Sequence, residues 1–479
     1  MKFLRWNFSL RSKRSGESCV RLAKLLVLLS VLLPASDLHS QEPSQDKNKF
    51  EIDLSDLQKE IDKVAAKPYS LGGFVEAQPT LLGVDRDSAF SRVRFFRHPP
   101  ASISDQHNFR LRLEGSYKHD IFSVFFKTDT QVQNDFDEWT EQTKLFEAYG
   151  SVKPSPSFIF EAGKKVMKWG KGYAWNPASF IDRPKNPEDP EEALEGSTVA
   201  TADYIKSFDG SLKTVALTTA LVPVYRHVNA DFGKLYHLNF ASKLYFLLYD
   251  TDLDFMALTG SSRTTRYGFD FSKNLTTNLE IHGEWAAINN FKIMSIDQQG
   301  RPSVQGLRAI SYLLGLRYLT EKETTYILEY YYNGTGFTKN QLENFADFVD
   351  AGFRTFEKTG NDGALRRASR LIEGPYGRSN PAQHYLYFRA SQKDPFDILY
   401  FTPALTSIIN LQDGSLVVIP ELAYSPITNL ELRFRTPVLV GGKKTEYGEK
   451  QNDYRVEFRL RYYFGLESLL GSFFDGTWR

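Results

Sequence analysis

The sequence contains little sulfur and no long apolar run. Its only cysteine is Cys19, and it has only 4 Met among 479 residues. A single cysteine excludes an intramolecular disulfide and a cysteine-based metal centre. The longest apolar run, residues 25–36, is shorter than the roughly 20 residues that a membrane-spanning helix needs. The chain is therefore neither a disulfide-stabilised scaffold nor a bundle of transmembrane helices.

The first forty residues have the organisation of an export signal. Seven Lys and Arg side chains precede the apolar run, and the polar stretch DLHSQEPSQ follows it. This pattern predicts a secretory signal peptide over residues 1–40, with cleavage near Ser40. Cys19 precedes the apolar run, so it is not a lipid-modified cysteine and is lost on cleavage. Removing seven basic and two acidic residues from totals of 59 and 58 leaves a net charge of about −4, which argues against nucleic acid as a partner.

Aromatic residues are abundant where sulfur is scarce. The 37 Phe and 25 Tyr are unusual for a soluble core, but they suit a wall whose alternate residues face lipid between two aromatic girdles. From Tyr69 onward, apolar and polar residues alternate, most regularly in FRLRLEG (109–115), NLELRFR (429–435) and DYRVEFRLRYYF (453–464). Alternation with a period of two predicts strands with one apolar and one polar face.

Eighteen candidate strands of about ten residues, the length of a tilted membrane strand, can be placed along the chain. Short links alternate with long ones over most of it, as in outer-membrane barrels. We therefore predict an all-β fold, a transmembrane antiparallel up-and-down β-barrel of about 16–18 strands over residues 69–464, with both ends periplasmic and a tail over 465–479. A soluble sandwich or propeller fits less well, because the chain is long and lacks a repeat of about 40–50 residues. The predicted strands begin near Tyr69, His107, Asp120, Thr140, Ser157, Val199, Ser211, Leu238, Thr251, Thr264, Thr276, Gly306, Glu323, His384, Phe396, Ser415, Thr428 and Asp453.

Residues 41–68 precede the barrel as a polar linker and a short helix. We expect an amphipathic periplasmic helix packed near the barrel mouth, with a pore plug and a partner-binding helix as the alternatives. The apolar residues at helical spacing are Ile52, Leu54, Leu57, Ile61 and Val64.

The final predicted strand, residues 453–464, carries a resemblance to a known class. Its apolar residues alternate, and an aromatic residue closes it. This resembles the closing strand of Gram-negative outer-membrane β-barrels, and residues 69–464 as a whole resemble porin-like barrels such as the alginate-export and putative porin families. The resemblance implies an outer-membrane location, recognition by the barrel assembly machinery, contact with outer-membrane lipid and lipopolysaccharide, and passage of small solutes. The tail after the terminal aromatic residue departs from the class. The matching residues are Val456, Phe458, Leu460, Tyr462 and Phe464.

Strand parity, by which alternate residues of a strand face opposite sides of the wall, assigns many charged side chains to the interior. If Phe109 and Leu111 face lipid, then Arg110 and Arg112 face the lumen, and the last two strands place further arginines beside them. Two central strands place acidic groups on the opposite wall. This segregation predicts a transverse field and a preference for anions, whereas the alternative is that arginines and carboxylates simply pair along the wall. The predicted pore-lining residues are Arg110, Arg112, Arg433, Arg435, Arg455, Arg459 and Arg461 on the basic side and Asp270, Glu280, His282 and Glu284 on the acidic side.

The stretch KWGKGYAWNPASFIDRP, residues 168–184, opens the long link 168–198. It lacks the spacing of a phosphate-binding loop. Its aromatic residues either join an outer aromatic girdle or fold inward as a constriction whose basic residues face the acidic run 188–196. The candidate constriction residues are Lys168, Trp169, Lys171, Tyr173, Trp175 and Arg183.

The longest link, residues 334–383, contains an apolar stripe at helical spacing. Folded inward, this segment would be a plug or constriction, and folded outward, a lid or partner surface. The basic run ALRRASRLIEGPYGR that follows the stripe would face either anionic lipopolysaccharide or solvent. The stripe consists of Leu342, Phe345, Val349, Phe353 and Phe356.

We expect no catalytic site, metal or cofactor. No G-x-S-x-G or comparable nucleophile setting occurs, and Glu280, His282 and Glu284 stand in line along one strand, which reaches poorly around a single ion. The prediction is a non-enzymatic channel for small solutes among which anions are favoured. The alternatives are a sealed structural, adhesive or partner-binding barrel, including a sheath for a periplasmic electron-transfer protein, and a barrel enzyme. Neither the solute nor the oligomeric state can be read from the sequence.

Overall fold

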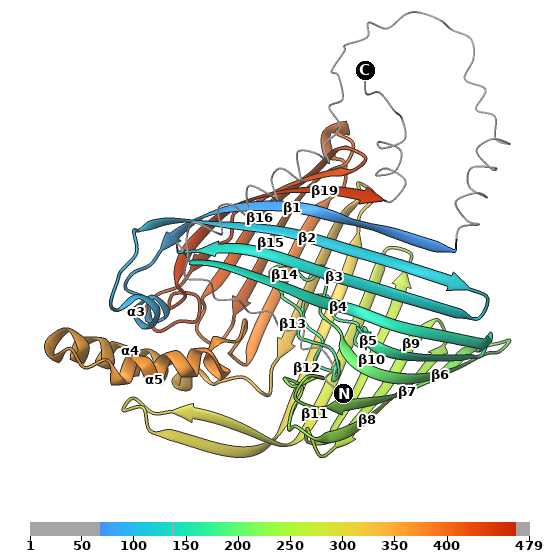
Figure 1. Ribbon diagram of the computed structural model, residues 1–479, viewed down its shortest axis with the longest axis horizontal. Coiled ribbons are helices and arrows are strands. Elements are labelled where there is room, and N and C mark those ends of the chain that lie inside the picture. The colour runs from blue at the N-terminus through green and yellow to red at the C-terminus, as the bar shows by residue number, and fades with distance from the viewer. Residues whose placement is uncertain (1–67, 137, 466–479) are drawn as a thin grey trace, which may run out of the picture.

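The computed structural model describes residues 68–136 and 138–465. Within them, one antiparallel sheet winds around a central axis, and helices lie at one of its ends (Figure 1). The strands are β1 (Tyr69–Val84), β2 (Ile103–His119), β3 (Phe122–Asp135), β4 (Glu138–Ser155), β5 (Phe158–Lys165), β6 (Ser197–Ser207), β7 (Leu212–Val224), β8 (His237–Leu248), β9 (Thr251–Gly260), β10 (Arg266–Thr276), β11 (Leu279–Ile296), β12 (Pro302–Leu319), β13 (Thr324–Tyr332), β14 (His384–Gln392), β15 (Phe401–Asn410), β16 (Leu416–Ile427), β17 (Leu430–Arg435), β18 (Val438–Val440) and β19 (Asn452–Gly465). The helices are α3 (Ala89–Phe95), α4 (Lys339–Thr359) and α5 (Gly363–Ile372), with the 3-10 turns η1 (Pro375–Gly377) and η2 (Pro395–Asp397).

The sheet is closed. Each strand from β1 to β17 pairs antiparallel with the strand before or after it in the sequence, and β1 also pairs with β19, from Gly72 opposite Gly465 to Val84 opposite Asn452. β17 and β18 lie end to end between β16 and β19, and Pro437, which has no N–H to donate, lies in the gap between them. The nineteen strands of the described chain therefore occupy eighteen positions in the wall. The predicted up-and-down barrel of 16–18 strands is confirmed.

All eighteen predicted strands are present, and the errors lie at their starts. The largest follows His384–Gln392, where the predicted strand from Phe396 begins only at Phe401. The intervening turn contains residues with positive φ, among them Asp394 and Phe396, which a continuous strand cannot contain. β11 and β12 are each 18 residues long, so this hairpin is longer than the roughly ten residues that a membrane crossing needs.

The wall is apolar outside and polar inside. Large outward-facing side chains such as Phe126, Phe255 and Leu314 are exposed, whereas inward-facing charged side chains such as Asp270 and Glu329 are buried. This arrangement is the reverse of a soluble protein and suits a lipid surround, because an outward Arg or Lys at the bilayer midplane costs about 2–4 kcal/mol. No helix among the described residues is long and apolar enough to cross a membrane.

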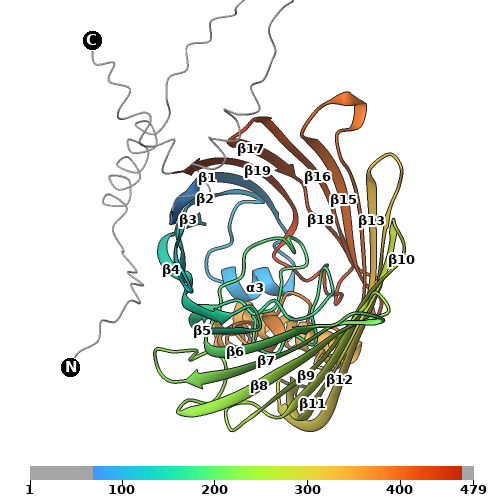
Figure 2. The ribbon, with the colours of Figure 1, turned by 90° about the vertical axis from the view of Figure 1, so that its right-hand side faces the viewer.

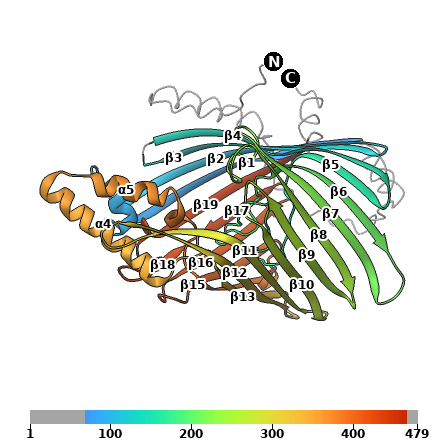
Figure 3. The same ribbon diagram turned by 90° about the horizontal axis from the view of Figure 1, so that it is seen from below.

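The helices form a cap at the end of the barrel that carries the long links (Figures 1 and 3). α4 begins with a capping box between Thr338 and Gln341 and ends at Gly360, whose φ of 73° is the left-handed conformation that glycine allows. Its predicted apolar stripe packs against α3, α5 and the β11–β12 hairpin in one apolar cluster. The link 334–383 therefore folds as a cap beyond the strand ends and is not a plug between them.

Three predicted segments fall at the ends of the chain. The signal peptide, residues 1–40, and the amphipathic helix over residues 52–64 lie outside the described residues, as does the tail apart from its first residue. A short helix is present near the start of the barrel, but it is α3, which follows the first strand and belongs to the cap.

Candidate functional site

The link between β5 and β6 folds into the barrel. We call residues 166–196 the inner loop. Its side chains and backbone contact inward-facing groups on β9, β11 and β13 on one side of the barrel and on β2, β17 and β19 on the other. In Figure 2, which looks along the barrel, the green segment between β5 and β6 lies inside the ring of strands. The inner loop therefore spans the lumen from wall to wall.

The first half of the inner loop is held by the carboxylate of Glu284 on β11. Glu284 Oε1 accepts the N–H groups of Lys171 and Gly172, each at 2.7 Å, and the side-chain amide of Asn176 at 2.8 Å. Glu284 Oε2 accepts the N–H of Ala178 at 3.1 Å. A single buried side chain thus accepts four hydrogen bonds, three of them from backbone N–H groups that would otherwise be unpaired inside the barrel.

Glu329 on β13 holds the next residues in the same way. Its two oxygens accept the N–H groups of Tyr173 at 2.5 Å and Ala174 at 2.9 Å. His282 Nε2 lies 2.8 Å from Glu329 Oε1, and His282 Nδ1 lies 3.6 Å from Glu280. The predicted residue His282 therefore lies between two carboxylates, hydrogen-bonded to Glu329 and at ion-pair distance from Glu280. No set of His, Cys, Asp and Glu among the described residues is arranged to hold a metal ion.

A third acidic contact involves Asp254 on β9. Lys171 Nζ lies 3.1 Å from its Oδ2. The predicted acidic residue Asp270 lies directly between Asp254 and Glu284 in the sheet register; it is 0% exposed, and neither of its oxygens has a hydrogen-bond partner. Three adjacent strands thus present buried carboxyl groups to the inner loop, with the Lys171 ammonium among them.

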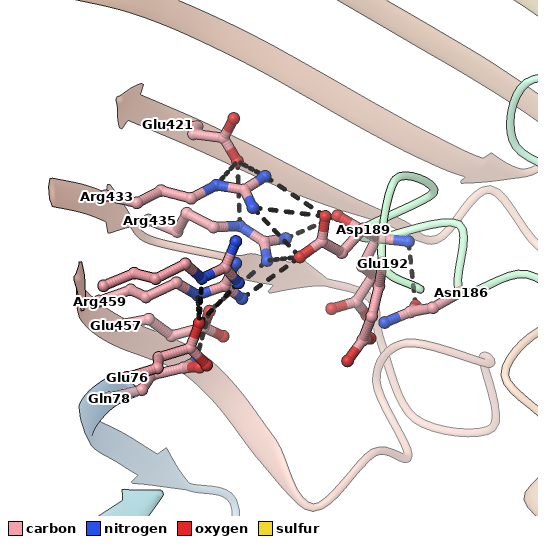
Figure 4. Close-up of polar contacts among 12 residues, drawn as sticks. Glu76, Gln78, Asn186, Asp189, Glu192, Glu421, Arg433, Arg435, Glu457 and Arg459 are labelled. Carbon is pink, nitrogen blue, oxygen red and sulfur yellow. Dashed lines mark hydrogen bonds and ion pairs between the residues drawn. The ribbon is translucent and has the colours of Figure 1, made fainter. Parts of the chain in front are cut away.

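The second half of the inner loop is acidic and lies against the arginines (Figure 4). Asp189 lies 3.2 Å from Arg433, 3.3 Å from Arg459 and 3.6 Å from Arg435. Burial alone would raise the pKa of Asp189, but these three guanidinium groups lower it below the ordinary value. Asp189 is therefore a stable anion that three strand residues share.

The remaining predicted arginines also have carboxylate partners. Arg112 lies 2.7 Å from Asp129 and Arg461 lies 2.6 Å from Glu76. The structure therefore brings together all seven predicted arginines with acidic groups, as the pairing alternative expects. The other pairs are Arg110 with Asp129 and Glu192, Arg455 with Glu188 and Glu457, and Arg433 and Arg435 with Glu421.

The aromatic residues of the inner loop face the inner side of the wall. Trp169 is 3% exposed and belongs to an apolar cluster with inward-facing residues of β6 to β9 and of β11. Trp175 is 7% exposed, stacks on Tyr331 with ring centroids 5.1 Å apart, and donates its indole N–H to Asn380. The hydroxyl of Tyr173 donates to Glu191. These rings therefore anchor the inner loop and do not lie in a lipid-facing girdle.

The expectation that basic residues of the inner loop face its own acidic run is met only in part. Arg183 lies 3.4 Å from Glu195. Lys171, in contrast, pairs with Asp254, because the acidic run is already engaged by arginines of the opposite wall. The side chain of Lys168 makes no hydrogen bond or ion pair with the described residues, whereas its backbone N–H donates to Asp182.

Several important residues were missed by sequence reasoning. The inward-facing groups Asp254, Glu329 and Glu421 lie on the buried faces of β9, β13 and β16, where apolar residues share the inward face, so the alternation of the sequence is weaker there. No sequence signal marks Asp182, whose carboxylate accepts the N–H of Met167 at 2.7 Å and so closes the inner loop on itself.

Two cavities flank the inner loop. The link-side cavity, of about 600 Å³, lies toward the cap and is lined by residues such as Lys168, Arg266 and Thr335. The turn-side cavity, of about 750 Å³, lies toward the short turns and is lined by residues such as Arg317 and Tyr400. Both cavities are also lined by Gly170, Lys185 and Glu191, so these three residues separate them.

The closed barrel of eighteen positions, its apolar outer surface and its charged interior define the chain as a porin-like β-barrel of the outer-membrane class. The resemblance drawn from the sequence is therefore confirmed at the level of class.

No family model and no curated protein sequence matches the chain. Solved structures with a similar fold include Pseudomonas aeruginosa OccK5 (OpdH), at 10% identity and a TM-score of 0.47, with 83% of this chain and 98% of that chain covered. A triple mutant of the Rhodopseudomonas blastica porin matches at 10% identity and a TM-score of 0.41, with 83% of this chain and 100% of that chain covered. Wzi of Escherichia coli matches at 10% identity and a TM-score of 0.47, with 87% of this chain and 89% of that chain covered. Wzi is described as a carbohydrate-binding β-barrel involved in group 1 capsule assembly.

Proposed function

We propose that this protein is an outer-membrane channel for small polar solutes, with the inner loop as its constriction. The observation that carries the proposal is the pair of polar cavities on the two faces of the inner loop. They share Gly170, Lys185 and Glu191 as lining residues, so the inner loop is the segment that stands between them. Charged groups at such a narrow point are how pores select among solutes.

Paired groups contribute little to selectivity. The arginines on β2, β17 and β19 are neutralised by wall carboxylates and by Glu188 and Asp189, so the transverse field is much weaker than strand parity alone predicts. Glu191 bonds only to the hydroxyl of Tyr173 among the described residues, and Lys185 bonds only to the carbonyl groups of Gly172 and Tyr173. We expect these two residues to dominate ion selection at the constriction.

Planar-bilayer recording of the refolded protein tests the proposal. We expect stepwise ohmic currents, and Glu191→Gln should move the reversal potential in a salt gradient toward that of anions. The matched control is Glu343→Gln on α4, whose carboxylate lies 3.9 Å from Lys339 in the cap, away from the barrel interior. A well-folded barrel without current, or an equal shift in both variants, would contradict the proposal.

A sealed barrel is the second candidate, and a specific observation favours it. The inner loop is bound to both walls by buried hydrogen bonds and ion pairs, and the cap lies at the link-bearing end. Such a barrel would act through its cap as a binding or structural surface. It would give no steady current in the same recording, so one experiment separates the two functions.

A further inference from the structure

The turn between β14 and β15, residues 393–400, differs from most other turns at the same end of the barrel. It has eight residues, whereas two residues join β2 to β3, β8 to β9 and β10 to β11. Phe396 is 87% exposed, and Leu399 and Tyr400 are also exposed. Phe396 and Tyr400 have φ values of 60° and 61°, a left-handed conformation that residues with a Cβ rarely adopt. Strained residues of this kind cluster at ligand sites, so the turn is a candidate binding surface.

A groove of about 450 Å³ adjoins this turn on the outer face of the wall. Ile398 of the turn lines it, together with residues of β15, β16, β17 and β19. Arg433 also lines the groove, but its guanidinium group points inward and lies 3.2 Å from Asp189. The other lining side chains are all apolar or aromatic. The groove therefore presents a hydrocarbon-like surface to the surroundings of the barrel.

The strand residues of the groove form two rows across the sheet. The row beside the turn consists of Phe401, Tyr424 and Leu432, which are paired in register. The row two residues further from the turn consists of Leu422, Phe434 and Phe458. Their sequence neighbours Glu421, Arg435 and Glu457 are buried inside the barrel, so both rows face outward. The groove thus runs along the strands, from the end of the barrel toward the middle of its wall.

The backbone explains why the wall is concave here. β17 has only six residues, and its pairing with β16 shifts in register between Tyr424 and Ile427. Such an irregularity bends and twists a strand pair locally. The groove is therefore shaped by the sheet and the turn, and it does not depend on the rotamer of one side chain.

A lipid acyl chain fits this groove in chemistry and in direction. The apolar lining offers no partner for the hydrogen bonds of water. A chain lying in the groove contacts side chains of β15, β16, β17 and β19 at once, so dispersion favours it over a chain on the regular wall. In barrels of this class the short turns lie on the periplasmic side, where the membrane leaflet consists of phospholipid. Lys393 and Tyr400 lie at the two ends of the turn, and both are exposed, so a cation and a hydroxyl lie at the level of the head group.

We propose that the groove binds one phospholipid of the periplasmic leaflet, with an acyl chain along the two rows and the head group beside Lys393 and Tyr400. The bound lipid holds the turn 393–400 at the membrane surface. Phe396 and Leu399 of the same turn then lie among neighbouring lipids, as aromatic and apolar residues do at the interfaces of such barrels. A site of this kind exists whether or not the barrel conducts.

Native mass spectrometry of the barrel, extracted from outer membranes in mild detergent, tests the site because it counts and identifies the lipids that stay bound. We expect one phospholipid on the wild-type barrel. Leu422→Trp and Leu432→Trp each fill one row of the groove with a larger side chain and should lower the ratio of lipid-bound to lipid-free barrel about tenfold. Both substitutions keep an apolar residue on the outer face, and the heat-dependent migration of folded barrels in gel electrophoresis checks that each variant has folded.

Leu314→Trp is the matched control. Leu314 is an exposed, outward-facing residue of β12 that does not line the groove, so this variant should keep the wild-type ratio within about twofold. A wild-type barrel without bound phospholipid would overturn the proposal, as would an equal loss in all three variants or no loss in either groove variant. Retention of lipopolysaccharide in place of phospholipid would assign the groove to the opposite leaflet and would also overturn it. A lipid-bound barrel that gives no bilayer current would contradict only the channel function.

Discussion

Glu284 is the residue whose loss should free the inner loop. Its carboxylate accepts donors from Lys171, Gly172, Asn176 and Ala178 at 2.7–3.1 Å. It is 3% exposed, so water does not readily replace these bonds. Glu284→Gln conserves the shape of the side chain, removes its charge and replaces one acceptor oxygen by a donor. The substitution therefore tests the hydrogen bonds without creating a cavity.

The magnitude follows from the four bonds. Hydrogen bonds to a charged group contribute about 1.5–3 kcal/mol to stability, and hydrogen bonds between neutral groups about 0.5–1.5 kcal/mol. Each of the three hydrogen bonds to Oε1 should therefore weaken by about 1 kcal/mol when the charge is removed. The N–H of Ala178 would meet an amide N–H₂, which cannot accept it. Relief of the desolvation of a buried carboxylate offsets part of the loss, leaving a net cost of about 2–3 kcal/mol. The ratio of undocked to docked loops should then rise about 30- to 150-fold.

Single-channel recording should show the released loop as frequent conductance substates and a larger mean conductance. Limited proteolysis should show faster cleavage within residues 166–196. The matched control is Glu280→Gln, at a position two residues away on the same inner face of β11. The carboxylate of Glu280 accepts the hydroxyl of Ser272 and lies 3.6 Å from His282, and no hydrogen bond or ion pair joins it to the described residues of the inner loop. If Glu284→Gln has the current noise and protease sensitivity of the wild type and of Glu280→Gln, the inner loop is held by other contacts and the reasoning is refuted.

Two further predictions concern single carboxylates. Asp189→Asn removes the anion shared by Arg433, Arg435 and Arg459, so it should shift the reversal potential toward anions; an unchanged potential would show that these arginines do not face the conducting path. Burial raises the pKa of Glu446, in the link before β19, from 4.5 to about 7. Because the folded state then holds the proton more tightly than the unfolded state, stability should fall by about 3 kcal/mol as the pH rises from about 4.5 to about 7, and Glu446→Gln should abolish this slope in urea unfolding at pH 5 and pH 8.

The barrel wall could be predicted because its determinants are local. Period-two alternation is set by residues that follow one another, and it places Arg433 and Arg435 on one face whatever the rest of the chain does. Closure follows from the same pattern, since the described barrel has no unpaired edge strand. The interruption of the wall between Arg435 and Val438 was not predicted. The strand that follows it, β18, has only three residues, which are too few to show a pattern of alternation.

The path of the inner loop could not be predicted, because its partners are distant in sequence. Lys171 and Asp254, or Asp189 and Arg459, meet only when the barrel has closed, and no local pattern in the stretch 168–184 indicates which wall it approaches. The packing of the cap could not be predicted for the same reason: the apolar stripe of α4 predicts a helix that folds inward as a plug or outward as a lid, but its partners in α3 come from the first link of the barrel.

The charge pattern of the inner loop explains why it lies across the lumen in one direction only. Its first half presents backbone N–H groups and the Lys171 ammonium to Asp254 and Glu284, and its second half presents Asp189 to the arginines. The reversed orientation would set Asp189 against a wall of buried carboxyl groups and leave the arginines without their shared anion, and a buried charge without its partner costs about 3–5 kcal/mol. The two charged walls therefore act first as docking surfaces for the inner loop, and the charges left to act on a solute are the ones that docking does not use.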